Sequence, residues 1–384
     1  MVVGFYTVVG EPVGRALQSV GLPDWLVATI YALVGAVFSL LAITGLVMLA
    51  LWAERRFIAR LQDRRGPNRV GRFGLLQSPA DVLKLVAKEN VVPGRADRFL
   101  HFVAPVLSVA AMFMTWAVLP WGPGLQPVDL NVAVLYLLAF GSVPPLAVVL
   151  AGWGSANKYS LFGGMRAVVQ YVSYEIPGAI VLLVPVLLAG TMSLRGIVSS
   201  QHGPMWNWFI FEPVFFVGPV PVPIPVIGFV SFIYYLIAGL AETNRTPFDH
   251  VEADSELTGG YFTEYSGIQW GLFMLSEYAS ACAICLIAAT LFLGGFHTGL
   301  GDAVDDLLWP LLPGVLLMKA ALLFLGFVWV RGTLPRFRYD QLMQFAWKRM
   351  LPVTLFLVGA TALWVPFAGM HTAVAVAPGA PPRR

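Results

Sequence analysis

The stretch ETNRTPFDHVEADSELTGGYFTEY, Glu242–Tyr265, is polar and lies between two long apolar segments, residues 224–241 and 268–293. It holds one base, Arg245, and six of the 21 carboxylates in the chain: Glu242, Asp249, Glu252, Asp254, Glu256 and Glu264. Carboxylates this close together repel one another and change each other's affinity for protons. A plain polar loop between two membrane helices needs fewer acids, so we interpret this stretch as part of a functional site.

The composition around this stretch is that of an integral membrane protein. Hydrophobic residues make up 58% of the 384 residues and charged residues 12%, whereas soluble domains carry about 25% charge. About 20 apolar residues span a bilayer as a helix. We therefore predict an all-α polytopic fold with eight spans: residues 26–53, 100–120, 132–152, 168–190, 224–241, 268–293, 311–330 and 350–369.

These spans predict one membrane domain over residues 1–384, with the transmembrane bundle at 26–369 and a disordered tail at 370–384. Residues 213–225 hold five prolines and cannot form a regular helix. Residues 74–88 alternate apolar and polar side chains in a way that predicts a short amphipathic helix at the membrane interface.

The basic residues predict the orientation. Of the 24 Lys and Arg residues, 19 lie in four alternate loops, at 54–98, 153–167, 242–267 and 331–349. Cytoplasmic loops carry the excess of Lys and Arg, so we expect these loops, and the acidic stretch, in the cytoplasm. Both termini then lie on the non-cytoplasmic side.

Two of the other cytoplasmic loops have their own patterns. The loop at 153–167 lies in the sequence GWGSANKYSLFGGMR (residues 152–166), which is rich in glycine and predicts a tight turn. Residues 331–349 contain Arg331, Arg336 and Arg338. These bases either anchor the loop at the membrane surface or dock it onto the acidic stretch.

Three charged residues fall inside predicted spans: Glu175, Glu277 and Lys319. Charges in membrane helices are costly and mark functional groups or polar contacts between helices. A Glu277–Lys319 pair is one such contact that the sequence allows. Cys282 and Cys285 lie in an apolar run, which predicts packing residues in a helix rather than ligands of a metal or an iron–sulfur cluster.

Four long motifs resemble one family. GPNRVGRFGLLQSPADVLKLVAKE (residues 66–89), GWGSANKYSLFGGMR followed by SYE, the acidic stretch itself and RFRYDQLMQFAWK (residues 336–348) occur in that order. Together they are similar to the membrane protein known as the H subunit of NADH-quinone oxidoreductase, respiratory complex I, and to its mitochondrial homologue, the first subunit of NADH dehydrogenase. The resemblance covers residues from about 26 to 360.

The resemblance implies a subunit of a proton-translocating NADH:quinone oxidoreductase in the bacterial cytoplasmic membrane. It implies quinone as substrate, no covalently bound cofactor and no metal, with NAD and iron–sulfur clusters held by partner subunits. The implied partners are the other membrane subunits, the peripheral-arm subunits and lipid. The matched motifs imply quinone-chamber residues Arg56, Arg245, Asp249 and Tyr265, and proton-coupling carboxylates Glu175, Glu242, Glu252, Asp254 and Glu256.

The chain departs from the family pattern at a few positions. No carboxylate occupies the third span near Ser142, where some relatives have a glutamate. Asp254 replaces the more usual glutamate, and His250 is unusual. The proline-rich segment at 213–225 has no counterpart that the resemblance supplies.

We expect this chain to couple quinone reduction to proton movement, with a Glu242–Arg245 pair made or broken as the local charge changes. Three alternatives remain open at this point. The chain could be the related membrane subunit of a membrane-bound hydrogenase complex, a free-standing transporter, or a structural anchor for peripheral proteins.

Overall fold

A computed structural model describes residues 24–212, 214–217, 220–223, 226–249 and 259–367. In these ranges the chain is almost entirely helical. The apolar helices of the bundle are α2 (Asp24–Leu61), α4 (Arg98–Trp116), α5 (Ala133–Gly141), α6 (Val143–Gly154), α7 (Lys158–Ala189), α9 (Ile227–Glu242), α11 (Gly267–Phe292), α13 (Leu312–Thr333) and α15 (Leu351–Phe367). The remaining α-helices are α3 (Gln77–Ala87), α8 (Leu194–Ser200), α12 (Asp302–Leu307) and α14 (Tyr339–Phe345).

Among the described residues, seven helical segments are long and apolar enough to cross a membrane, and Ile227–Glu242 is a shorter apolar helix. The predicted all-α membrane fold is therefore confirmed. The segments α5 and α6 form one span that bends at Ser142, just before Pro144 and Pro145. The amphipathic helix predicted at 74–88 is α3, whose Leu83 and Val86 are exposed.

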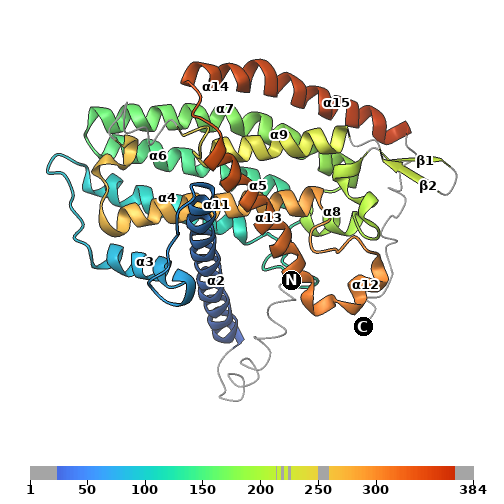
Figure 1. The fold of residues 1–384 in the computed structure, drawn as a ribbon, viewed down its shortest axis with the longest axis horizontal. Helices are drawn as coiled ribbons and strands as arrows, with labels where there is room; N and C mark the ends of the chain where they lie inside the picture. Colours follow the sequence, from blue (N-terminus) through green and yellow to red (C-terminus); the bar gives the residue numbers. More distant parts are fainter. Residues whose placement is uncertain (1–23, 213, 218–219, 224–225, 250–258, 368–384) are drawn as a thin grey trace.

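Most of the long helices run along the long axis of the molecule, and α2 crosses them (Figure 1). Helix α11 lies at the centre and packs against α2, α4, α9 and α13. Among the candidate spans of the described residues, α11 has the largest share of buried residues. Cys282 and Cys285 are buried in α11 as unpaired thiols, so their predicted role as packing residues is confirmed.

Within the proline-rich segment 213–225, the described residues are not helical, as predicted. The described part of this segment forms two antiparallel strands, β1 (Val214–Val217) and β2 (Val220–Pro223), paired from Val214 with Pro223 to Val217 with Val220. This hairpin lies at the end of the molecule that also carries α8 and α12, opposite α3 (Figure 1).

The prediction of a tight turn at 153–167 is wrong for most of that loop. Helix α7 already begins at Lys158, where the Asn157 side chain accepts a hydrogen bond from the Tyr159 amide. The glycines that suggested a turn serve close packing instead. A Cβ atom on Gly163 would lie 2.6 Å from the Gly260 Cα atom, so only glycine lets the two segments approach.

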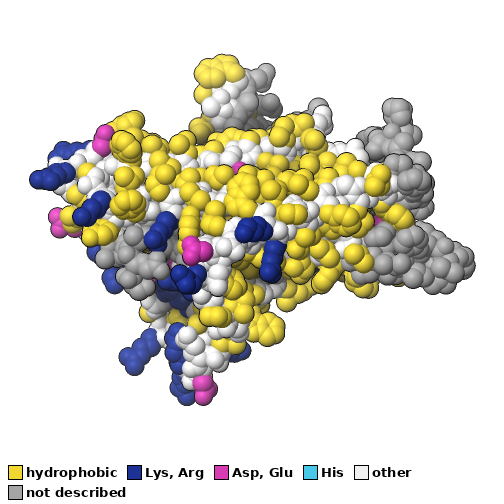
Figure 2. All heavy atoms as spheres, turned by 90° about the horizontal axis from the view of Figure 1, so that it is seen from above, with side chains coloured by type: hydrophobic (Ala, Val, Ile, Leu, Met, Phe, Trp, Pro, Cys, Tyr) yellow, Lys and Arg dark blue, Asp and Glu magenta, His cyan; other side chains and the backbone are white. Residues whose placement is uncertain are grey.

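Hydrophobic side chains cover most of the face shown in Figure 2, and the Lys and Arg side chains gather in one half of it. Tyr339–Val365 forms the last candidate span. It starts earlier than predicted because a π-helical segment, Ala346–Met350, joins α14 to α15. The apolar face and the basic half in Figure 2 suit helices that lie in lipid with a basic surface at one end.

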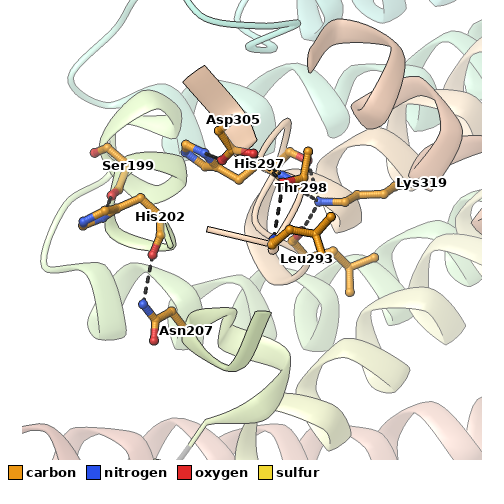
Figure 3. A network of polar contacts seen from close by, with 10 residues as sticks. Ser199, His202, Asn207, Leu293, His297, Thr298, Asp305 and Lys319 are labelled. Carbon is orange, nitrogen blue, oxygen red and sulfur yellow. Dashed lines mark hydrogen bonds and ion pairs between the residues drawn. The ribbon is translucent and has the colours of Figure 1, made fainter. Parts of the chain in front are cut away.

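The end opposite that basic half is held by a polar network (Figure 3). Lys319 donates hydrogen bonds to the carbonyls of Leu293 (2.6 Å), Gly295 (2.9 Å) and His297 (2.6 Å), just beyond the C-terminus of α11. The Glu277–Lys319 pair that the sequence allowed is therefore not formed. A lysine satisfies the unpaired carbonyls at the end of a helix and offsets its dipole.

Asp305 closes the same network. Its carboxylate accepts hydrogen bonds from the Thr298 amide (2.9 Å) and hydroxyl (2.5 Å) and from His297 Nδ1 (2.8 Å). Burial alone would raise the pKa of Asp305, but these hydrogen bonds from Thr298 and His297 hold it below its ordinary value. The charged form is therefore the one that the fold stabilises.

We predict that Asp305→Asn lowers the thermal inactivation temperature of the assembled complex by several degrees at neutral pH, because about 2 kcal/mol of charge-assisted hydrogen bonding is lost. A group with a lowered pKa stabilises the fold above its unfolded pKa. The deficit should therefore stay constant above about pH 5 and shrink below about pH 4. Asp306→Asn, at an exposed position of the same helix, is the control. Equal melting of the two variants would contradict the prediction.

Candidate functional site

Glu54 on α2 lies buried between two arginines. Its Oε2 atom is 2.8 Å from Arg245 Nη1, and its Oε1 atom accepts from Arg331 Nη1 on α13. Glu54 is 3% exposed and Arg245 5%. We call Glu54, Arg245 and Arg331 the ion cluster. Arg331 is half-buried, with 33% of its side chain exposed. Two positive charges thus face one negative charge, so the cluster carries a net positive charge of one.

Aromatic rings complete the surroundings of Arg245. Its Cζ atom lies 4.3 Å from the ring centroid of Tyr278 on α11 and 5.4 Å from that of Phe324 on α13. Burial would lower the pKa of Arg245, but the nearby Glu54 carboxylate and Tyr278 raise it above its ordinary value. Arg245 thus stays charged inside the protein.

Arg245 reaches this place through the turn Ala241–Phe248, which begins at the last two residues of α9. Asn244 adopts a left-handed backbone conformation (φ 48°) that ends the helix. The Phe248 amide then donates to the Arg245 carbonyl at 2.8 Å. The turn sends Arg245 toward α2, away from the axis of α9. The predicted Glu242–Arg245 pair is therefore wrong, because the helical spacing that it required ends at Glu242.

Glu242, at the other end of this turn, faces two small adjoining cavities. Both are lined by Glu242, by Glu175 on α7 and by Ser280 on α11. The first, about 30 Å³, is also lined by Glu277, and the second measures about 80 Å³. Each volume is large enough to hold a water molecule among polar groups. We call Glu175, Glu242 and Glu277 the carboxylate group.

Neutral polar side chains join the carboxylate group. The Tyr261 hydroxyl donates to Glu277 Oε1 at 3.3 Å. The Ser142 hydroxyl, at the bend where the sequence has no carboxylate, donates to the carbonyls of Leu138 (3.2 Å) and Ala139 (3.0 Å). Ser108 on α4 and Ser276 on α11 hydrogen-bond each other at 2.8 Å and line the first cavity. The cavities thus hold carboxylates and hydroxyls and have space for water. Carboxylates, hydroxyls and water are groups that relay protons.

Three of the predicted site residues lie apart from both groups. The Arg56 guanidinium packs over Trp52 and Phe73 and donates to the Phe73 carbonyl. Asp249 pairs with Arg336 at 3.0 Å. Tyr265 is buried beside Phe273 and stacks on His101 with ring centroids 4.1 Å apart, and burial raises its pKa above the ordinary value.

Other predicted residues do meet. Glu175 and Glu242 share the cavities, and Arg245 joins the ion cluster. Glu252, Asp254 and Glu256, together with His250, lie outside the described residues. Within the described ranges, no group of three or more His, Cys, Asp or Glu side chains is arranged to hold a metal ion.

The sequence analysis did not identify Glu54 or the role of Arg331 at the site. Both are the first charges after long apolar runs, at residues 54 and 331. The sequence could have indicated their pairing, because the two residues carry opposite charges and each lies at the boundary of an apolar span. Arg331 and Arg336 also favour docking over membrane anchoring for the loop at 331–349. Arg336 pairs with Asp249 of the acidic stretch, and Arg331 pairs with Glu54, which also binds Arg245.

Comparison with known proteins is consistent with this geometry. The family model described as NADH dehydrogenase matches residues 34–362. The H subunit of NADH-quinone oxidoreductase from Thermomicrobium roseum is 43% identical over 357 residues, covering 88% of this chain and 97% of the relative. The corresponding protein of Dehalococcoides mccartyi strain CBDB1 is 41% identical over 331 residues, covering 86% of both chains.

The chain belongs to the H-subunit family of NADH-quinone oxidoreductase. The family and the enzyme class expected from the sequence are therefore confirmed, and the chain is a multi-pass membrane subunit of that complex. Membership in this family favours the quinone enzyme over a hydrogenase complex, a free-standing transporter or an anchor.

We predict that Glu54→Ala destabilises the fold of this membrane subunit far more than Asp81→Ala does. The first change leaves the buried Arg245 guanidinium without its carboxylate, at a cost of about 3–5 kcal/mol, and also removes the partner of the half-buried Arg331. The second breaks the Arg55–Asp81 pair, which is 41% and 31% exposed, and such pairs contribute about 0–1 kcal/mol. The yield of assembled complex and its melting temperature measure the difference. Similar losses in both variants would show that the ion cluster is not a buried charge site.

Proposed function

We propose that this subunit forms part of the quinone chamber of NADH-quinone oxidoreductase and couples quinone reduction to proton translocation. One observation carries the proposal. The turn Ala241–Phe248 presents Glu242 to the carboxylate group at one end and places Arg245 in the ion cluster near its middle. A change of charge at either place therefore acts on a segment shared by both.

The chemistry of the substrate suits this arrangement. A quinone that accepts two electrons from a partner subunit becomes basic and takes up two protons. A net positive ion cluster stabilises the electron-rich reduced form while it waits for those protons. The chain itself supplies charge stabilisation, orientation and proton-binding groups, and the electrons come from a partner.

The carboxylate group then responds to the new charge. Glu175 and Glu242 line the same two cavities and interact electrostatically. Interacting carboxylates bind protons as a pair, so a nearby change of charge alters how many protons the pair holds. We propose that this change starts proton transfer toward the other membrane subunits, with Ser142 beside Glu175 as the next polar group.

The remaining predicted residues take supporting places in the proposal. Glu252, Asp254 and Glu256 would add negative charge that takes up protons near the chamber. Arg56 and Tyr265 would shape its wall, and Asp249 would fix the acidic stretch through its pair with Arg336. The loops on this side would contact the peripheral-arm subunits that bring the electrons.

Glu242→Gln tests the coupling. We expect the purified complex in liposomes to lose most of its proton pumping per NADH oxidised, because the amide cannot bind and release a proton. Asp306→Asn, at the opposite end of the molecule, should pump normally. NADH-driven quenching of a pH-sensitive dye, recorded together with the NADH:quinone rate, gives the ratio. Unchanged turnover and pumping in Glu242→Gln would refute the coupling role.

We also propose the orientation, with both termini outside the cytoplasm. Ser199 lies exposed at the α8 end, and Arg64 lies exposed in the basic loop after α2. In spheroplasts, a membrane-impermeant maleimide should label Ser199→Cys directly and Arg64→Cys only after permeabilisation. The native thiols are buried and provide a low background. The reverse labelling pattern would invert the proposed topology.

A further inference from the structure

Gln170 on α7 is fully buried and binds both ends of the turn that links the two groups. Its Nε2 atom donates to the Ala241 carbonyl at 2.8 Å and to the Phe248 carbonyl at 2.9 Å. It also lies 3.2 Å from the Asn244 Oδ1 atom. One amide nitrogen therefore binds the carbonyls of two residues, Ala241 and Phe248, that are seven positions apart in the sequence.

The orientation of this amide is fixed by its partners. Two of the three acceptors are backbone carbonyls, which cannot rotate or donate, so the nitrogen side of the amide must face them. Within the described part of the chain, Gln170 Oε1 contacts no donor. The site thus uses the two N–H groups of a glutamine and not its carbonyl.

Neighbouring residues of α7 hold the same turn. The Tyr171 hydroxyl accepts a hydrogen bond from Asn244 Nδ2 at 2.5 Å. The Tyr174 ring packs edge-on against Phe248, with centroids 5.4 Å apart. The next residue along the helix is Glu175, which lines both cavities. One short segment of α7 therefore grips the turn and presents a member of the carboxylate group.

We propose that Gln170 is the positioning residue that ties the ion cluster to the carboxylate group. It keeps Arg245 against Glu54 and Glu242 beside Glu175 by fixing the turn between them to α7. The inference rests on the proposed function and adds the residue through which a displacement of the turn reaches Glu175. Gln170 touches neither quinone nor a transferred proton in this role.

Gln201 offers a matched control for a merely structural role. It is also fully buried, and its Nε2 atom donates to the carbonyls of Ile197 (3.2 Å) and Thr290 (3.1 Å). Its Oε1 atom accepts from the amides of Phe209 and Gly294. Gln201 thus makes at least as many hydrogen bonds as Gln170, but it joins α8 to α11 and has no contact with the turn.

The test compares Gln170→Met with Gln201→Met in the whole complex. Methionine keeps the volume of glutamine and removes its hydrogen bonds. For Gln170→Met we expect a rise of about fivefold in the KM for quinone, the effect of one lost hydrogen bond, and a fall in protons pumped per NADH. Reduction of ferricyanide by NADH should stay normal. For Gln201→Met we expect a lower melting temperature with an unchanged KM and pumping ratio.

Two further variants sharpen the result. Gln170→Glu keeps the shape but turns a carboxylate oxygen toward the two carbonyls, and it should affect the KM and the pumping ratio more than Gln170→Met. Tyr171→Phe removes the hydroxyl that accepts from Asn244 and should shift both in the same direction by a smaller factor. It serves as the test if the Gln170 variants fail to assemble.

The positioning role is overturned if Gln170→Met, or Tyr171→Phe in its place, changes only the melting temperature, as Gln201→Met does. Failure of the proposed function looks different. In that case Glu242→Gln pumps normally, and a raised KM in Gln170→Met would still show that the turn positions Arg245. The two results are therefore distinguishable.

Discussion

The Glu54 carboxylate, buried between Arg245 and Arg331, is the interaction on which the functional end of the molecule depends. Its two oxygens each bind one guanidinium group, and these groups come from α13 and from the turn after α9. Removing buried charges from water is costly unless each is paired. The three segments must therefore meet in one arrangement, and one positive charge remains in excess among them.

The turn Ala241–Phe248 connects the ion cluster to the two cavities that the carboxylate group lines. Its left-handed residue Asn244 breaks the helix between Glu242 and Arg245, so the two charged side chains point to different surroundings. A continuous helix would have brought them together as a simple pair. The break instead gives one carboxylate to the cavities and one base to Glu54, and α7 holds the turn through Gln170, Tyr171 and Tyr174.

Hydropathy predicted the membrane-crossing helices and the amphipathic helix α3, and charge inside an apolar span drew attention to Glu175, because those features depend on local composition. The ion cluster could not be predicted in the same way. Its hydrogen bonds join residues 191 and 277 positions apart, and periodicity within a helix does not say which helices are neighbours. The glycines of residues 153–167 misled the prediction for a related reason, since Gly163 packs on Gly260, which is distant in sequence.

The far end of the molecule determines which element can respond to a change of charge. Lys319 and Gln201 fix the C-terminal end of α11 through backbone carbonyls, and α11 packs among four other long helices. Gly239 brings α9 so close to α11 that a Cβ atom there would lie 2.3 Å from the Ile284 side chain. The bodies of α9 and α11 are therefore locked together. In the proposed mechanism, a new charge beside Glu54 acts on the turn beyond Glu242. Gln170 and Tyr171 hold that turn to α7, so α7 is the helix that receives the displacement.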